Sequence, residues 1–407
     1  MRTKPRIAVI SPFLDKRHGT ERCVAEQIER LAEDYEIHLY SSAVDDVDLS
    51  KIVWHWIPRL PGPHLVRYLW FFAANHFQRW WDRRFRKLDF DLIFSPGINC
   101  LDADFIAVHI VFAEFYRLGY KELSLRRNPL RMWPWLIHRK LTYLLFILLE
   151  RRIYRQNELR LAVISHKMER DLERCFNRRG RLALVYHGVD VDHLNPIRRQ
   201  NLRNEVRRRL QLPESAFTLL LVGNDWKKKG LPCLIAAVSS LRNPNLWILL
   251  RGQDGSSSCQ DLLKEEGLEN RAVILPSVPQ IESHYAAADL YVGPSLEDSF
   301  AIPPLEAMAC GLPVIVSRQA GVSELLTHGV DGFVLEDPTD SRQLAELICR
   351  IYEDANLRQW LGARAAETAR HYTWKRNGEE MKVLFDECLR EQKRKSRNGE
   401  QVAVVRR

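Results

Sequence analysis

Short apolar runs, each bounded by Gly, Pro or polar residues, alternate with segments of helical periodicity along nearly the whole chain. This alternation is typical of parallel sheets whose strands are joined by helices. It predicts two doubly wound α/β domains. The strands predicted in the first half are 6–13, 36–42, 52–58, 91–96, 105–112, 161–165 and 182–187. Those predicted in the second half are 218–223, 246–252, 272–278, 290–294, 313–317 and 332–335.

The length of 407 residues also fits two domains, each large enough for its own core. We place the first domain at 1–190 and the second at 191–373, because the strand predicted at 182–187 is followed by Gly188 and then by a polar segment. An amphipathic helix is predicted over 374–393, and we expect it to pack back on the first domain. The remaining residues, 394–407, are expected to form a basic tail.

Cysteine usage and apolar segment lengths indicate where the protein works. The eight cysteines are scattered without a C-x-x-C pair, which favours a reducing compartment. The N-terminal apolar run is too short for a signal peptide, and the longest apolar stretch, 141–149, is too short to span a bilayer. We therefore expect a cytoplasmic protein, at most peripheral on the inner face of the cell membrane.

The positive charge of the chain is concentrated in one region. Lys and Arg number 61 against 52 Asp and Glu, a net charge of +9. Residues 51–185 alone hold 25 basic and 12 acidic side chains, so their surplus of 13 exceeds that of the whole chain. A local anionic partner, such as a membrane surface, a nucleic acid or a phosphorylated ligand, is expected there.

Two segments of this region, 54–86 and 126–155, interleave aromatic with basic residues. Rings and arginines on an amphipathic helix suit an anionic lipid surface. The plainer interpretation, that the rings face the core and the arginines face water, is preferred for most of the nine aromatic residues of the first segment. Binding of a single nucleic-acid strand ranks last, because no nucleic-acid motif accompanies the rings. The nine are Trp54, Trp56, Trp70, Phe71, Phe72, Phe77, Trp80, Trp81 and Phe85.

The segment 294–317 holds the most informative constellation of residues. A strand ends at Pro294, and an acidic loop leads to a helix that Pro303 and Pro304 suit to begin. Glu306 is expected in the first turn of this helix, where it would accept hydrogen bonds from vicinal hydroxyls. Phosphate or sugar oxygens would bind the backbone N–H groups just before the helix. These N–H groups are those of Phe300, Ala301 and Ile302.

A simpler interpretation of the acidic residues is that Asp298 and Glu306 only stabilise the positive end of the helix dipole. The whole segment, however, resembles the signature of the family 4 (group 1) retaining glycosyltransferases of GT-B fold. That signature has two Glu separated by seven residues ahead of an Ala-Met-Ala-Cys-Gly-x-Pro-Val run. Glu306 matches the second Glu, and Asp298 stands in place of the first. The resemblance implies two Rossmann-like domains facing each other across a cleft.

It further implies that Glu306 holds the nucleotide ribose and Asp298 the hydroxyls of the donor sugar. Lys228 and Lys229 match the family's positions for the donor diphosphate, although a solvated lysine run is the alternative. Residues 281–289 match a short helix beside the nucleotide base, with 276–279 as the base-contacting loop.

Three further positions follow from the same resemblance. Gly19 would let the backbone approach the donor or the acceptor. His109 would lie near the reacting sugar, the alternative being a satisfied core histidine. Gly188 matches the hinge between the domains.

Asp-x-Asp pairs occur three times, at 46–48, 102–104 and 190–192, so the pattern alone carries little weight as a metal site. We expect no catalytic metal and no cofactor. The predicted function is that of a retaining, metal-independent hexosyltransferase. Its expected donor is a nucleotide sugar, with a UDP-sugar as the first candidate, and its expected acceptor is a glycan or lipid-linked molecule, as in lipopolysaccharide or cell-surface polysaccharide biosynthesis. An anionic membrane surface is an expected partner and nucleic acid is not. A non-hydrolysing sugar-nucleotide epimerase of the same architecture and a catalytically silent membrane or nucleic-acid binding protein are the alternatives, and the oligomeric state is left open.

Overall fold

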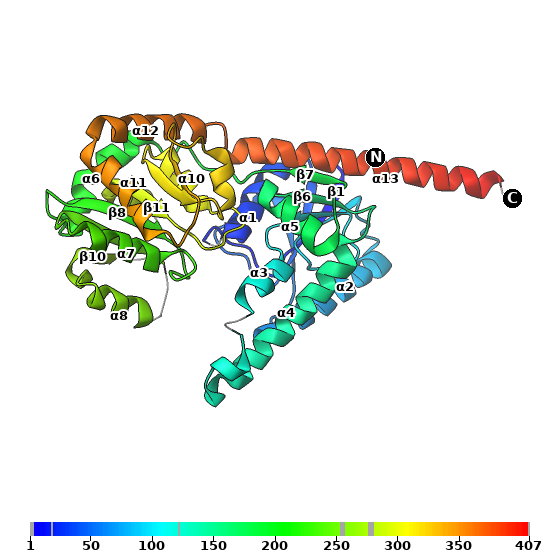
Figure 1. Cartoon of the computed structure of the whole chain (residues 1–407). Coiled ribbons are helices and arrows are strands. Elements are labelled where there is room, and N and C mark those ends of the chain that lie inside the picture. Colours follow the sequence, from blue (N-terminus) through cyan, green and yellow to red (C-terminus); the bar gives the residue numbers. More distant parts are fainter. Residues whose placement is uncertain (1–3, 18, 121–122, 253–256, 276–280, 406–407) are drawn as a thin grey trace. The chain divides into compact units, whose positions relative to one another are not determined.

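The computed structural model describes residues 4–17, 19–120, 123–252, 257–275 and 281–405 (Figure 1). The chain forms two compact units. Unit 1 comprises residues Met1–Tyr186 and Asn377–Arg407, and unit 2 comprises His187–Arg376. Each unit has a parallel sheet with alternating helices, so the prediction of two doubly wound, Rossmann-like α/β domains is confirmed. Unit 2 begins a few residues before the boundary expected at 190.

The sheet of unit 1 has seven parallel strands in the order β3-β2-β1-β4-β5-β6-β7. Its strands are β1 (Arg6–Ile10), β2 (Glu36–Ser41), β3 (Ile52–Trp56), β4 (Leu92–Pro96), β5 (Phe105–Val108), β6 (Arg160–Val163) and β7 (Leu182–Leu184). Its helices are α1 (Gly19–Leu31), α2 (His64–Arg86), α3 (Phe112–Gly119), α4 (Trp133–Tyr154) and α5 (His166–Phe176), with short turns η1 (Leu49–Lys51), η2 (Leu125–Arg127) and η3 (Leu130–Met132).

Strand β1 lies in the middle of this sheet and is buried on both faces. Val9 pairs in register with Leu39 of β2 and with Phe94 of β4. Helix α13 (Trp374–Val405) adds Phe385 to the same core, where its ring lies 5.2 Å from that of Phe94. The helix continues to Val405, so residues 394–405 of the expected basic tail are helical.

The sheet of unit 2 has six parallel strands in the order β10-β9-β8-β11-β12-β13. Its strands are β8 (Phe217–Val222), β9 (Leu246–Arg251), β10 (Ala272–Leu275), β11 (Leu290–Gly293), β12 (Val314–Ser317) and β13 (Phe333–Leu335). Its helices are α6 (Pro196–Arg209), α7 (Leu231–Leu241), α8 (Ser257–Glu265), α9 (Glu282–Ala287), α10 (Ile302–Ala309), α11 (Ser341–Glu353) and α12 (Ala355–Ala369), with short turns η4 (Glu269–Arg271) and η5 (Gly321–Leu325).

All thirteen predicted strands are present, with ends that differ by a few residues. The largest difference is at 105–112, where β5 ends at Val108. His109 therefore follows the strand and belongs to the loop before α3. The apolar residues that continue the run, such as Ile110 and Phe112, line a cavity and do not extend the sheet.

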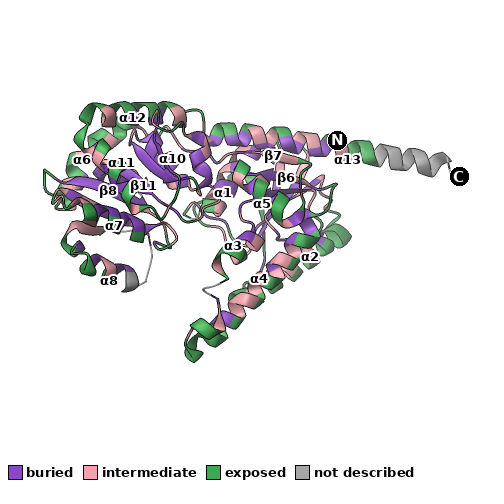
Figure 2. Ribbon diagram, viewed as in Figure 1, coloured by how far each residue is buried: buried purple, intermediate pink, exposed green. Residues whose placement is uncertain are grey.

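The aromatic residues of the basic region lie mostly on the surface (Figure 2). The interpretation that they face the core is wrong for seven of the nine, because only Phe71 is buried and Phe72 half-buried. The exposed seven are Trp54, Trp56, Trp70, Phe77, Trp80, Trp81 and Phe85. Among the described residues, no helix is long and apolar enough to cross a membrane.

Candidate functional site in unit 2

The predicted donor residues of unit 2 gather at the carboxyl ends of β8 and β11. These neighbouring strands are where the order of the sheet reverses direction, which is the usual ligand position in such folds. The loop after β8 carries Lys228 and Lys229, and the loop after β11 carries Asp298. The two loops are joined by a backbone hydrogen bond of 2.8 Å from the N–H of Leu296 to the carbonyl of Lys228.

Gly230 makes this close approach of the loops possible. Its φ of +84° lies in the left-handed region, and a Cβ there would lie 1.9 Å from the carbonyl oxygen of Pro294. Any side chain would both strain the backbone and push the two loops apart. The glycine at the end of the lysine run is thus required by the geometry of the site.

Lys229 and Asp298 form an ion pair between Nζ and Oδ2. Both side chains are largely buried, at 26% and 14% exposure. Lys228 lies beside them with a half-buried side chain, 3.6 Å from Asp225. The structure therefore brings the predicted diphosphate ligand Lys229 and the predicted sugar ligand Asp298 into direct contact.

The backbone between Asp298 and α10 turns sharply at Ala301. Its φ of +69° is unfavourable for a residue with a Cβ, and such strain costs about 1–3 kcal/mol. Within the described chain, the N–H groups of Ala301 and Ile302 donate no hydrogen bond to protein acceptors. They lie at the N-terminus of α10, where the helix dipole favours anions.

The third predicted donor, Phe300, differs from this pair. Its N–H lies 3.3 Å from Oδ1 of Asp298 and donates to that carboxylate. Its carbonyl accepts from the N–H of Val322, and its ring is buried. Phe300 therefore holds the loop in shape, with its N–H directed to Asp298, and its predicted part in donor binding stays a prediction.

Glu306 lies deeper than expected. Helix α10 begins at Ile302, which places Glu306 in the second turn rather than the first, and it is only 1% exposed. The hydroxyl of Tyr285 on α9 donates to Oε2 of Glu306 at 2.5 Å. Burial, and next the nearby Glu306 carboxylate, raise the pKa of Tyr285 well above its usual value, so the phenol stays a donor.

The contact of Tyr285 with Glu306 is the feature of this site that sequence reasoning missed. The sequence predicts a helix beside the base at 281–289, and α9 lies in this segment. From the sequence alone, Tyr285 cannot be distinguished from an ordinary aromatic residue of the core. The one usable signal was a phenol in a buried helix, because a buried Tyr hydroxyl usually has a polar partner. The base-contacting loop predicted at 276–279 lies outside the described residues.

Unit 1 has a cavity of about 180 Å³ at the carboxyl ends of β1, β4 and β5, again where the strand order reverses. His109 lines it, and the burial of this residue lowers its pKa to about 4, so the imidazole is neutral at pH 7. Gly19 begins α1, whose next two residues also line the cavity. Rings from α2 and α4 complete the wall, namely His64, Tyr68, Phe146 and Tyr154.

Gly188 is fixed by its neighbours within unit 2. A Cβ at this position would lie 2.3 Å from the backbone nitrogen of Trp374, and Val189 forms an isolated parallel bridge with Thr373. The geometry requires glycine here, and the role of Gly188 as a hinge stays a prediction.

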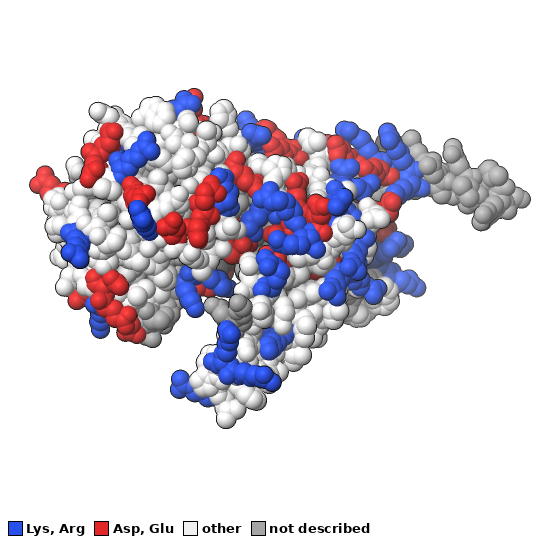
Figure 3. All heavy atoms as spheres, in the orientation of Figure 1, with Lys and Arg blue, Asp and Glu red and all other residues white. Residues whose placement is uncertain are grey.

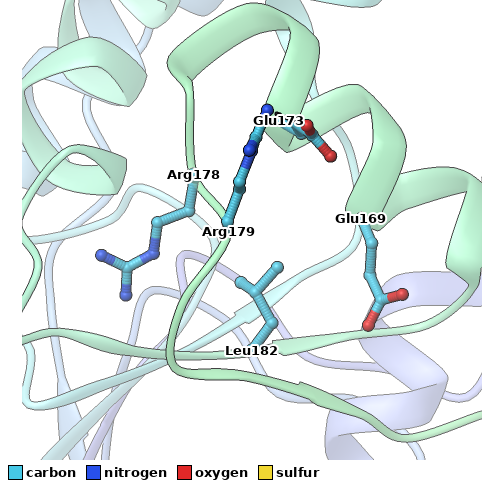
Figure 4. Close-up of a pocket in the computed structure, with 5 residues that line it drawn as sticks. All are labelled: Glu169, Glu173, Arg178, Arg179 and Leu182. Atoms are coloured by element: carbon cyan, nitrogen blue, oxygen red, sulfur yellow. Dashed lines mark ion pairs between the residues drawn. The ribbon is translucent and has the colours of Figure 1, made fainter.

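A larger cavity of about 420 Å³ in unit 1 lies beside α5 and β7 (Figure 4). Arg179 pairs with Glu173 at 2.7 Å. Arg178 is directed away from both glutamates of the cavity in Figure 4 and donates to the carbonyl of Gln156. The arginines are thus engaged within the protein, and we assign no ligand to this cavity.

Both halves of the chain match family models for glycosyltransferases. Residues 17–193 match the family model for Glycosyltransferase Family 4, and residues 203–368 match that for glycosyl transferases group 1. D-inositol 3-phosphate glycosyltransferases are among the similar sequences. The one from Salinispora tropica is 30% identical over 52% of this chain and 47% of its own length. The one from Thermobispora bispora is 31% identical over 51% of each chain. The chain spans about half the length of these curated relatives.

Similar solved structures cover nearly the whole chain. WaaG, a glycosyltransferase involved in lipopolysaccharide biosynthesis, has a TM-score of 0.75 at 19% identity and covers 92% of this chain and 98% of its own. HepE of Anabaena, in complex with UDP and glucose, has a TM-score of 0.71 at 19% identity and covers 94% of this chain and 100% of its own. At this identity the likeness concerns the fold.

Proposed function

The chain belongs to the family 4 (group 1) glycosyltransferases of GT-B fold, and from this premise we propose that it transfers a sugar from a UDP-sugar to an acceptor hydroxyl. The observation that carries the proposal is the junction of the β8 and β11 loops. There the ion pair of Lys229 with Asp298 joins the two loops, and the N–H groups of Ala301 and Ile302 lie at the start of α10.

The donor diphosphate is bound by positive charge and by the helix N-terminus. Lys229 exchanges Asp298 for a phosphate oxygen, with Lys228 beside it, and the N–H groups of Ala301 and Ile302 donate to the same group. The leaving diphosphate gains charge in the transition state, so these donors stabilise it most at that point. We propose that this cationic set replaces a metal ion.

Asp298, released from Lys229, accepts hydrogen bonds from hydroxyls of the donor sugar. Glu306, oriented by Tyr285, holds the nucleotide ribose. The two contacts fix the anomeric carbon for attack by the acceptor, and transfer proceeds with retention of configuration. The part predicted for His109, a neutral imidazole in the cavity of unit 1, stays a proposal.

The acceptor hydroxyl is supplied through the cavity of unit 1. We propose a glycan or lipid-linked acceptor at an anionic membrane surface, as in lipopolysaccharide or cell-surface polysaccharide biosynthesis. A D-inositol phosphate is a second candidate, favoured by the names of the relatives that are about 30% identical. The protein would act in the cytoplasm, peripheral to the inner face of the membrane.

A donor screen tests the proposal. Release of UDP is measured with candidate UDP-sugars in the presence of inositol phosphate, a glycan or a lipid-linked glycan, and the acceptor product is analysed by mass. UDP release together with an elongated acceptor supports transfer. A new epimeric nucleotide sugar formed without acceptor would identify an epimerase instead. Lys229→Gln and Glu306→Gln should lose transfer, whereas Lys227→Gln, on the exposed adjacent lysine, should keep it.

A further inference from the structure

Helix α2 presents an apolar stripe to solvent. Val66, Trp70, Phe77 and Trp81 recur at helical spacing and are 40–61% exposed. Trp80 and Phe85 widen the stripe at its C-terminal half, where the four rings of this part contact one another at centroid distances of 4.2–6.2 Å. An exposed aromatic cluster of this kind is unusual on a protein with no partner for it.

Helix α4 presents a second stripe of aliphatic side chains. Ile137, Leu141, Leu144 and Leu148 follow one another at intervals of four, three and four residues and are 43–61% exposed. At the N-terminal end of the helix, Trp135 is 51% exposed, with the guanidinium of Arg139 5.0 Å from its ring centroid. The outward face of α4 is thus apolar along most of its length.

The charges on these two helices have one sign at the surface. Helices α2 and α4 contain two acidic residues, Asp82 and Glu150, and both are buried. Asp82 accepts from the hydroxyl of Tyr40, and Glu150 accepts from backbone N–H groups at the start of α3. The exposed basic residues of the helices and of the turn before α4 are Arg67, Arg83, Arg84, Arg86, Arg126, Arg127, Arg131, Arg151 and Arg152. The N-terminal end of α4 and the turn before it, at the lower tip of the view in Figure 3, are accordingly white and blue.

The opposite faces of the same helices wall the cavity beside His109. Tyr68 of α2 and Phe146 of α4 pack with ring centroids 4.6 Å apart, and both line the cavity. The two helices therefore separate the cavity from their own apolar outer faces.

We propose that the outer faces of α2 and α4 form one docking surface for an anionic lipid bilayer. The apolar stripes insert at the level of the headgroups, and the arginines bind lipid phosphates. This inference deepens the proposed function, and rests on it in one respect: the acceptor is then a membrane amphiphile that reaches the cavity of unit 1 from the docked bilayer.

Charge and shape favour a bilayer over other occupants. In a symmetric dimer, the same face of a second copy would bring arginines against arginines, with no acidic side chain on either helix surface to offset them. A nucleic-acid strand needs rings on which to stack, and the α4 stripe offers aliphatic side chains. An anionic bilayer satisfies the arginines and both stripes together.

Co-sedimentation of the full chain with vesicles tests the surface. The chain is expected to bind vesicles of equimolar phosphatidylcholine and phosphatidylglycerol. Binding should fall steeply when the salt concentration is raised, and when the vesicles contain phosphatidylcholine alone. The double variant Arg151→Glu with Arg152→Glu should weaken binding at least tenfold, since each surface arginine contributes about fivefold. The double variant Phe77→Ser with Trp80→Ser should also weaken binding at least tenfold, because it removes two rings that insert at the level of the headgroups. Trp360→Ser on α12 and Arg208→Glu with Arg209→Glu on α6 change exposed side chains of the same types in unit 2. They should bind as the unchanged chain does.

Two further readouts keep the outcomes distinct. Thermal unfolding of each variant checks that it is folded. UDP release with a soluble form of the acceptor headgroup should be unchanged in Phe77→Ser with Trp80→Ser, while the KM for the same headgroup on a lipid in vesicles should rise at least tenfold. Equal binding by folded α2 or α4 variants, or binding that ignores lipid charge, overturns the docking surface even if transfer persists. Binding as expected without UDP release from any donor overturns the proposed function and leaves the surface standing.

Discussion

The hydrogen bond from Tyr285 to Glu306 gives a prediction that can be worked out from the structure. Both side chains are at most 1% exposed, and the hydroxyl lies 2.5 Å from the carboxylate oxygen. Tyr285→Phe removes this donor and little else, because the ring keeps its place in the core. A hydrogen bond to a charged group contributes about 1.5–3 kcal/mol, a factor of roughly 10–150 in an equilibrium constant.

We therefore expect the free energy of unfolding of Tyr285→Phe to fall by about 2 kcal/mol in urea titration. If Tyr285 also orients Glu306 toward the ribose, kcat/KM for the donor should fall by about tenfold or more, chiefly through KM. Tyr352→Phe is the matched control, because its hydroxyl contacts Asn245 away from the site.

A double-mutant cycle separates this pair from general damage to the core. In the Glu306→Gln background, Tyr285→Phe should cost clearly less than in the unchanged chain, with a coupling free energy above about 1 kcal/mol. Additive effects on both stability and donor KM would refute the reasoning that the phenol acts through Glu306.

Three other perturbations have outcomes fixed by single contacts. Lys229→Gln should lower kcat/KM about 100-fold, measured by UDP release, while Lys227→Gln leaves it unchanged. Gly230→Ala should destabilise unit 2 by at least about 2 kcal/mol in urea titration because its Cβ would meet Pro294, whereas Gly267→Ala, with φ +65° and open space, should cost about 1 kcal/mol. His109 has its pKa lowered by burial from 6.5 to about 4, so the unfolded chain takes up the proton first. Stability should fall by about 3 kcal/mol as pH drops from 6.5 to 4, and the unfolding free energy of His109→Asn should lose that slope.

The strands could be predicted because parallel strands buried on both faces are continuous apolar runs. The run 218–223, for example, corresponds to β8 at Phe217–Val222. The strand predicted at 105–112 extends beyond the end of β5 at Val108, because the residues that line the cavity after it are as apolar as residues in a sheet. The cleft expected between the domains stays a prediction.

The site was predictable only in part, because motif positions identify loops and not their contacts. Spacing placed Lys229 and Asp298 after neighbouring strands, yet their ion pair depends on how two loops close around Gly230. The pairing of Tyr285 with Glu306 depends on the packing of α9 against α10, which no local pattern encodes.

The surface helices show a further limit of sequence reasoning. Periodicity identified aromatic and basic residues in the region of α2 and α4, but not which face the protein covers. An apolar face normally packs inward, and that expectation was wrong for seven of the nine aromatic residues of 54–86. The inward face of α2 holds Tyr68 and Phe71 together with the polar residues Asn75, Arg79 and Asp82.

Product analysis with a labelled UDP-sugar tests the proposed transfer most directly. The full chain is incubated with donor and with inositol phosphate, glycan or lipid-linked acceptors, and UDP and the sugar-bearing product are quantified together. We predict one UDP for each sugar transferred, a product whose anomeric configuration by NMR matches that of the donor, and loss of both in Lys229→Gln. Donor consumed without any glycosylated acceptor, or an inverted linkage in the product, would contradict retaining transfer by this site.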